Sequence, residues 1–188
     1  MEQFPIELKI LFIKYLSYKN VIMYLCLDNI YNFDIEELYA MSYSTPWFVA
    51  IEKGYLKLTK FLVNDYGINP AKERKIDGLT ALHIASGQGH IHIIKYLLSL
   101  PNINSINYHH TDIGTPLHQA VNQPETLKVL LEYGGADVNV QDNDGKTALH
   151  LAAYVHNKRS IRILLSHGAN KAAKCIHGYK PIDYYKLN

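Results

Sequence analysis

The sequence predicts an all-α repeat solenoid, because one short pattern recurs along most of the chain at a nearly constant interval. The best-formed copy is DGKTALHLAA, which begins at Asp144. Related copies are DGLTALHIAS, TPLHQAV, TPWFVAI and the partial HGYKPIDYY. The threonine slot of the pattern falls at Thr45, Thr80, Thr115, Thr147 and Lys180, so the intervals are 35, 35, 32 and 33 residues. A period of about 33 residues is typical of stacked units, each with two helices.

Two short apolar helices are predicted before the first repeat. In residues 4–16, the apolar side chains at positions 8, 11, 12, 15 and 16 have the spacing of one helix face. Pro5 suits the first turn of this helix. Residues 17–20 separate it from a second apolar run, residues 21–27. Such apolar helices need cover, either from the first repeat or from a partner protein.

The first two repeats are predicted to hold two helices each, joined by a glycine turn. In the first repeat the helices lie near residues 46–52 and 56–63, with Gly54 between them. In the second repeat Gly89 marks the turn, and Pro101 follows the second helix.

The later units depart from this pattern. In the third repeat the turn has lost two residues and reads QPE from Gln123, so we expect its first helix to end differently. The fourth repeat has His156 where the second has its turn glycine, and the last unit contains one helix only. We expect this unit to present a polar outer face through Lys180, Asp183, Lys186 and Asn188.

The motifs of these units resemble the ankyrin repeat. The resemblance rests on the threonine pattern and on Gly89-His90, Leu97-Leu98, Leu130-Leu131, Leu164-Leu165, the GADVN run from Gly135 and the GAN run from Gly168. It implies helix-turn-helix units with hairpin fingers, and it predicts that residues 43–188 form four repeats and a C-terminal half repeat. It also implies a protein-binding role with no catalytic residues, no cofactor and no metal.

In ankyrin repeats the variable positions lie on the fingers and at the end of each first helix, where they line the concave side. The resemblance therefore predicts a target-binding face made of Tyr43, Ile76, Asp77, Leu79, Gln88, Thr111, Asp112, Asn122, Gln123, Asn143, Asp144, Lys146, Tyr154, Val155, Ile176, His177 and Tyr179. The apolar and aromatic members are the strongest candidates for contact, because tyrosine is enriched at binding hot spots. The alternative is that these side chains pack along the fingers.

The ten histidines invite a metal hypothesis, but their spacing argues against it. His83, His118 and His150 occupy one slot in three successive repeats, so they should lie roughly 10 Å apart. Metal ligands must lie within about 2.1 Å of the ion. The resemblance implies instead that these histidines form hydrogen bonds within or between repeats.

The sequence also argues against nucleotide and calcium sites. Gly145-Lys146-Thr147 is similar to the end of a phosphate-binding loop, but Val140 stands where the loop needs an earlier glycine. Val140 and Leu151 likewise occupy the first and last ligand positions of a calcium loop. No nucleophile has a base partner that spacing predicts, so we do not expect an enzyme or a small-molecule substrate.

The N-terminal segment, residues 1–42, is similar to an F-box. Phe4-Pro5-Ile6-Glu7-Leu8 and Tyr15-Leu16 match that pattern, although Leu27-Asp28-Asn29 replaces its usual tryptophan-containing end. This resemblance implies an adapter that docks on the Skp-type linker of a cullin-RING ubiquitin ligase through Phe4, Pro5, Leu8, Leu11, Phe12, Leu16 and Val21. The alternative is a plain ankyrin scaffold in which these helices only cap the repeats.

Composition fits a protein that acts inside cells. The 188 residues are 48% hydrophobic with a formal net charge of +2, and no basic stripe recurs from unit to unit, which argues against nucleic-acid binding. Only two cysteines occur, and the longest apolar run near the N-terminus is too short for a signal or membrane segment. We therefore expect a location in the cytoplasm, or in the cytoplasm or nucleus of a host cell.

Overall fold

The computed structural model describes residues 46–64, 67–101, 106–110 and 113–186, and the chain divides between Asn69 and Pro70 into two compact units. In these ranges the helices are short, and strand pairing is limited to isolated bridges. The predicted all-α repeat architecture is therefore confirmed. Within the described ranges, no helix is long and apolar enough to cross a membrane. The two predicted N-terminal helices, and Tyr43, lie outside the described residues.

The described part of the first unit is a helical hairpin. Helix α4 (Pro46–Glu52) packs against α5 (Leu56–Asn64), and the predicted bounds agree with these to within one residue. Gly54 forms the turn with a φ of 77°, a left-handed conformation that glycine adopts without strain. The core of this hairpin consists of Trp47, Phe48, Val49, Ala50, Ile51, Leu58 and Leu62.

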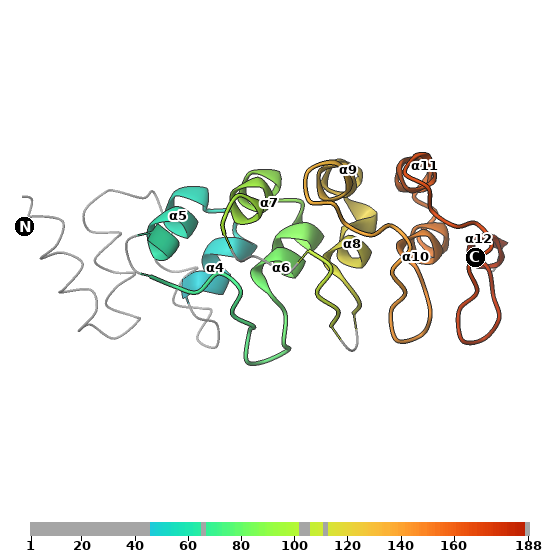
Figure 1. Ribbon diagram of the computed structural model, residues 1–188, viewed down its shortest axis with the longest axis horizontal. Helices are drawn as coiled ribbons and strands as arrows, with labels where there is room; N and C mark the ends of the chain where they lie inside the picture. Colours follow the sequence, from blue (N-terminus) through green and yellow to red (C-terminus); the bar gives the residue numbers. More distant parts are fainter. Residues whose placement is uncertain (1–45, 65–66, 102–105, 111–112, 187–188) are drawn as a thin grey trace, which may run out of the picture. The chain divides into compact units, whose positions relative to one another are not determined.

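The second unit is a stack of helical pairs. Its first helices are α6 (Ala81–Gln88), α8 (Pro116–Gln119), α10 (Ala148–Tyr154) and α12 (Pro181–Lys186), and its second helices are α7 (Ile91–Leu98), α9 (Pro124–Glu132) and α11 (Lys158–Ser166). Figure 1 shows the first helices in one row and the second helices in another, with loops extending from the row of first helices. Neighbours in each row pack on one another, which buries a continuous core.

The threonine slot of the repeat starts each first helix. Thr80, Thr115 and Thr147 have extended backbone conformations at the N-cap position. The side chains of Thr115 and Thr147 also form capping boxes with the histidine three residues later. Such caps satisfy backbone N–H groups that the first turn of a helix leaves without partners. The repeated threonine and histidine therefore fix where α6, α8 and α10 begin.

The third repeat has a shortened first helix, as the missing turn residues predict. Helix α8 has four residues and is followed by the 3₁₀ turn η1 (Ala120–Asn122). Pro124 then begins α9. The shortened turn therefore tightens the end of the first helix while the second helix keeps its length.

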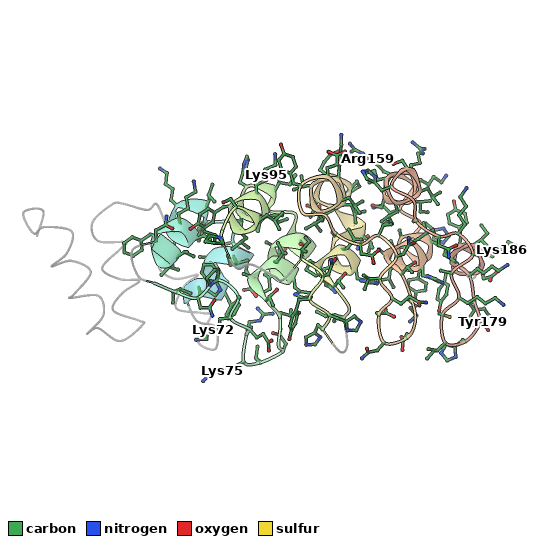
Figure 2. All side chains as sticks on the ribbon, viewed as in Figure 1. Lys72, Lys75, Lys95, Arg159, Tyr179 and Lys186 are labelled. Atoms are coloured by element: carbon green, nitrogen blue, oxygen red, sulfur yellow. The ribbon has the colours of Figure 1, made fainter. Side chains whose placement is uncertain are left out.

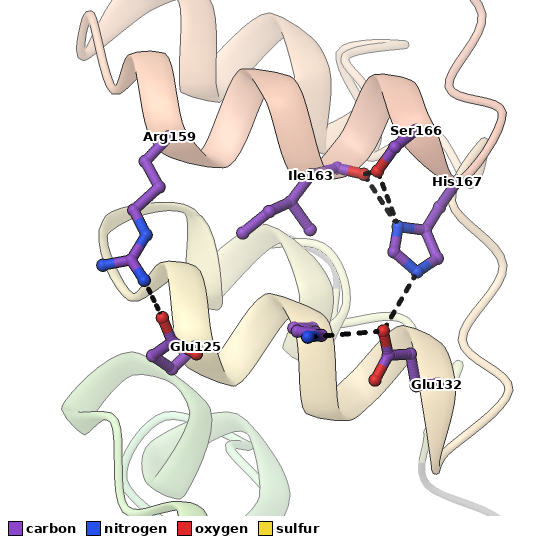
Figure 3. Close-up of polar contacts among 7 residues, drawn as sticks. Glu125, Glu132, Arg159, Ile163, Ser166 and His167 are labelled. Carbon is purple, nitrogen blue, oxygen red and sulfur yellow. Dashed lines mark hydrogen bonds and ion pairs between the residues drawn. The ribbon is translucent and has the colours of Figure 1, made fainter.

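Side-chain contacts link the second helices across repeats (Figure 3). Arg159 on α11 pairs with Glu125 on α9. At the other end of the two helices, Nε2 of His167 lies 3.8 Å from a carboxylate oxygen of Glu132. The pair of Arg159 and Glu125 is exposed, so it contributes at most about 1 kcal/mol to stability. The two contacts show that the basic side of α11 faces the acidic side of α9.

The expected polar face of the last unit is only partly present. Lys180 and Lys186 are exposed, but Ile182 on the same helix is 53% exposed. In the earlier repeats a second helix packs on the first helix, as α7 does on α6 and α11 on α10. An apolar groove opens between α11 and α12.

Candidate functional site

The fingers of the second unit are short hairpins, each closed by an isolated bridge. Isolated antiparallel bridges join Glu73 with Thr80, His110 with Gly114, and Gln141 with Thr147. In the third of these fingers, the carboxylate of Asp142 accepts hydrogen bonds from the backbone N–H groups of Asp144 (3.0 Å) and Lys146 (2.8 Å). The tip is therefore a fixed turn that holds its exposed side chains in place.

The buried histidines join each finger to the next one. Nε2 of His83 lies 3.1 Å from the carbonyl oxygen of Gly114, and Nε2 of His118 lies 3.0 Å from that of Lys146. Nε2 of His150 lies 3.2 Å from the carbonyl oxygen of Tyr179. Each carbonyl directly precedes the threonine slot of the following unit. The predicted hydrogen bonds of these histidines within and between repeats are confirmed.

Hydrogen bonds define which ring nitrogen of His118 and of His150 carries the proton. The backbone N–H groups of Thr115 and Thr147 donate to Nδ1 of His118 (3.1 Å) and of His150 (3.0 Å). Nδ1 is therefore an acceptor, and the proton of the neutral ring lies on Nε2, where it is donated to the carbonyl. Burial lowers the pKa of His118 and of His150, and it lowers the pKa of His83 to about 4. Among the described residues, no group of three or more His, Cys, Asp or Glu side chains could hold a metal ion.

Apolar side chains are exposed on the fingers and at the end of α10. Ile76 is 72% exposed on the first finger, and Ile176 is 64% exposed on the last. Tyr154 and Tyr179 are 51% and 48% exposed, and Val155 is 39% exposed. Figure 2 shows Tyr179 extending from the last finger, on the same side as Lys72 and Lys75 of the first finger. The exposed polar candidates are Gln88, Asn122, Asn143, Asp144 and His177.

The tyrosines of the last two units form a cluster. The ring of Tyr184 on α12 lies 6.4 Å from that of Tyr154 and 6.1 Å from that of Tyr179, with edge-to-face angles of 79° and 85°. The hydroxyl of Tyr184 donates a hydrogen bond to Sγ of Cys175 (3.5 Å), and burial raises the pKa of Tyr184 to about 12. We call Tyr154, Tyr179 and Tyr184 the tyrosine cluster. The ring of Tyr184 therefore contacts both exposed rings.

Several predicted site residues are held by intramolecular contacts. Arg74 pairs with Asp77 at 2.5 Å and, through this hydrogen bond, lowers the pKa of that carboxyl group. Lys146 pairs with Asp144 at 2.8 Å, which raises the pKa of the lysine and lowers that of the aspartate. Leu79 and Gln123 are half-buried. The two ion pairs lie within single fingers and hold these charged side chains in place.

Sequence reasoning missed residues that tie neighbouring fingers together. The hydroxyl of Tyr108 donates a hydrogen bond to the carboxylate of Glu73, and Nε2 of His109 lies 3.1 Å from the carbonyl oxygen of Gln141. Tyr184 was also absent from the predicted set, although its place in the last copy of the helix pattern puts it beside Tyr154. The predicted residues Thr111 and Asp112 lie outside the described part of the chain.

Comparison with known proteins points to one family. A family model described as ankyrin repeats matches residues 12–112 and 100–175. The chain is 33% identical over 138 residues to human transient receptor potential cation channel subfamily A member 1, covering 71% of the chain and 12% of that protein. It is 32% identical over 110 residues to dog inversin, and this match covers 56% of the chain and 10% of that protein.

A viral relative gives a similar match. The chain is 33% identical over 123 residues to a putative ankyrin repeat protein of Fowlpox virus (strain NVSL). That match covers 64% of the chain and 29% of the viral protein. The chain thus spans less than a third of the length of each of these relatives.

Proposed function

Because this chain belongs to the ankyrin repeat family, we propose that it binds a partner protein through the tyrosine cluster and the fingers beside it. Ankyrin repeats are protein–protein interaction modules, and stacked repeats use their shared residues to pack on one another. The side chains that differ between units and are exposed are then available for recognition. In the last two units these side chains are unusually apolar.

The tyrosine cluster is the observation that supports this site. Tyr154 and Tyr179 together expose two aromatic rings that Tyr184 holds at fixed distances. Ordered tyrosines lose little conformational entropy on binding and offer both apolar area and a hydroxyl group. Val155 and Ile176 add apolar area, while Asn143 and Asp144 supply a polar rim. This composition fits a protein surface as the ligand.

The proposal is tested by affinity capture with the purified chain, followed by quantitative comparison of the proteins retained. The test variant is Tyr154→Ala/Tyr179→Ala. The matched control is Tyr133→Ala, because Tyr133 is 70% exposed but lies at the end of α9 and outside the cluster. A partner lost with the double variant and kept with the control would support the site. Equal retention by all three proteins would contradict it.

The F-box-like segment suggests a more specific role as a ubiquitin-ligase adapter. In this role the repeats hold a target while Phe4, Pro5, Leu8, Leu11, Phe12, Leu16 and Val21 dock on a Skp-type linker. The apolar character of these residues and their spacing support the role. The ankyrin match begins at residue 12, which supports the alternative that much of this segment caps or extends the repeats.

A binding titration against a purified Skp-type linker distinguishes the two roles. The variant Leu8→Glu/Leu11→Glu changes two residues that precede the ankyrin match. Its fold is checked by circular dichroism against the wild-type protein. Micromolar or tighter binding that this variant abolishes would support the adapter. A folded wild-type protein that does not bind would leave a plain ankyrin module.

A further inference from the structure

An apolar groove with a basic rim lies at the C-terminal end of the second unit, between α11 and α12. Its volume is about 580 Å³. The apolar side chains in its wall include Leu149, Ile161 and Ile182. The residues of the tyrosine cluster do not line it. The groove is therefore a second candidate surface, separate from the finger side.

The repeat register explains why this surface is open. Ile182 occupies the slot of Leu82 and Leu117, which are 1% and 2% exposed, yet Ile182 is 53% exposed. Ile161 likewise occupies the slot of Ile94 and Leu127, which are fully buried, but is only half-buried itself. In the earlier repeats the next second helix completes the cover, since α7 packs on α9 and α9 on α11. The groove thus lies where another second helix would pack.

The charges around the groove indicate what kind of helix it fits. Lys158, Arg162 and Lys171 line it, and its lining contains no acidic side chain. On the opposite side of α11, Arg159 and His167 lie against the acidic residues of α9 (Figure 3). The stack therefore already pairs basic residues of α11 with glutamates of a neighbouring second helix. A helix in the groove would meet basic side chains again.

We propose that the groove binds an acidic amphipathic helix of a partner protein, seated as the next second helix of the stack. The second helices of the chain show the pattern that such a helix needs. In α9 and α11 a small polar residue is followed by two apolar residues three positions apart, as in Thr126-Leu127 with Leu130. Glutamates on either side of the apolar face would then lie near Lys158 and Arg162.

Fluorescence anisotropy with the full chain tests this proposal. The probe is a fluorescein-labelled peptide of about 18 residues, long enough to be helical, with leucines at i, i+3, i+4 and i+7 and glutamates at the flanking positions. A second peptide carries lysines in place of the glutamates. The variants are Ile182→Glu and Arg162→Glu, both at exposed positions, and the charge control is Lys75→Glu on the first finger.

We expect the glutamate peptide to bind, and each groove variant to weaken binding about ten-fold or more. Lys75→Glu and Tyr154→Ala/Tyr179→Ala should leave the affinity unchanged, which separates this site from the finger surface. Equal affinity for the lysine peptide, or an equal effect of Lys75→Glu and Arg162→Glu, would overturn the proposal. A wild-type dimer in sedimentation that Ile182→Glu dissociates would also overturn it, because the occupant would be a second copy.

Discussion

The hydroxyl of Ser160 donates a hydrogen bond of 2.6 Å to the carbonyl oxygen of Val121. The side-chain amide of Asn157 donates a second one, of 3.1 Å, to the same oxygen. Val121 lies in η1, where the first helix of the third repeat is cut short, so this carbonyl has lost the partner that a longer helix would give it. The following repeat supplies the missing donors. These two hydrogen bonds link the shortened third repeat to the start of α11.

Replacing Ser160 by alanine should destabilise the second unit by about 1–2 kcal/mol, because a buried hydrogen bond is lost. Ser166→Ala is the matched control, since Ser166 donates a hydrogen bond to the carbonyl of Ile163 at an exposed position. Urea denaturation followed by circular dichroism measures both. An equal loss of unfolding free energy in the two variants would show that the hydrogen bond to Val121 adds no stability.

Acid should destabilise the repeats between pH 6.5 and about 4. The pKa of His83 is lowered from 6.5 to about 4, mainly by burial, so the folded state excludes a proton that the unfolded chain binds. Its contribution to stability is complete above pH 6.5 and is lost as the pH falls toward 4. For His83 alone the loss amounts to about 3 kcal/mol. The lowered pKa values of His118 and His150 act in the same direction.

Urea unfolding of the wild type and of His83→Gln at pH 7 and pH 4.5 checks this prediction. Glutamine keeps a side-chain donor for the carbonyl of Gly114 but does not titrate. The variant should therefore lose less stability than the wild type over this interval. An identical loss in both proteins would mean that other groups determine the acid sensitivity.

Gly145→Ala should be more destabilising than Gly178→Ala, although both glycines have a left-handed φ, of 71° and 78°. A Cβ at Gly145 would lie 3.0 Å from the backbone nitrogen of Ile176, whereas a Cβ at Gly178 would meet nothing within 4 Å. The backbone strain is about 1–2 kcal/mol in both, and the contact with the last finger adds roughly 1 kcal/mol or more at Gly145. Thermal melts of the two variants compare them, and equal melting temperatures would contradict the predicted contact.

The fold was predictable because the repeat period and the threonine slot are local signals. The period placed α4 and α5 to within one residue, and the lost residues before Pro124 predicted a changed end for the first helix of that repeat. The two donors on the carbonyl of Val121 could not be predicted in the same way. These hydrogen bonds depend on how two adjacent repeats pack against each other, and the sequence of one repeat alone does not predict that packing.

The candidate site was predictable only in part. The finger pattern pointed to Ile76, Ile176 and Tyr179, which are exposed, but it gave no sign that Tyr184 would hold two rings together. The expectation of a polar end face counted charged residues and overlooked Ile182. That side chain follows the apolar pattern of the earlier first helices, where Leu82 and Leu117 are buried, so residue type alone does not determine its exposure. Whether these surfaces bind remains a prediction.

The most direct measure of the proposed binding surface is the affinity of the tyrosine cluster for the partner that affinity capture identifies. Isothermal titration of that purified protein with the wild type, Tyr154→Ala/Tyr179→Ala and Tyr133→Ala measures it. We predict that the double variant binds about a hundred-fold more weakly, because two hot-spot tyrosines are removed, while Tyr133→Ala binds like the wild type. Equal affinities of the double variant and the wild type, with both proteins folded, would contradict the proposed binding surface.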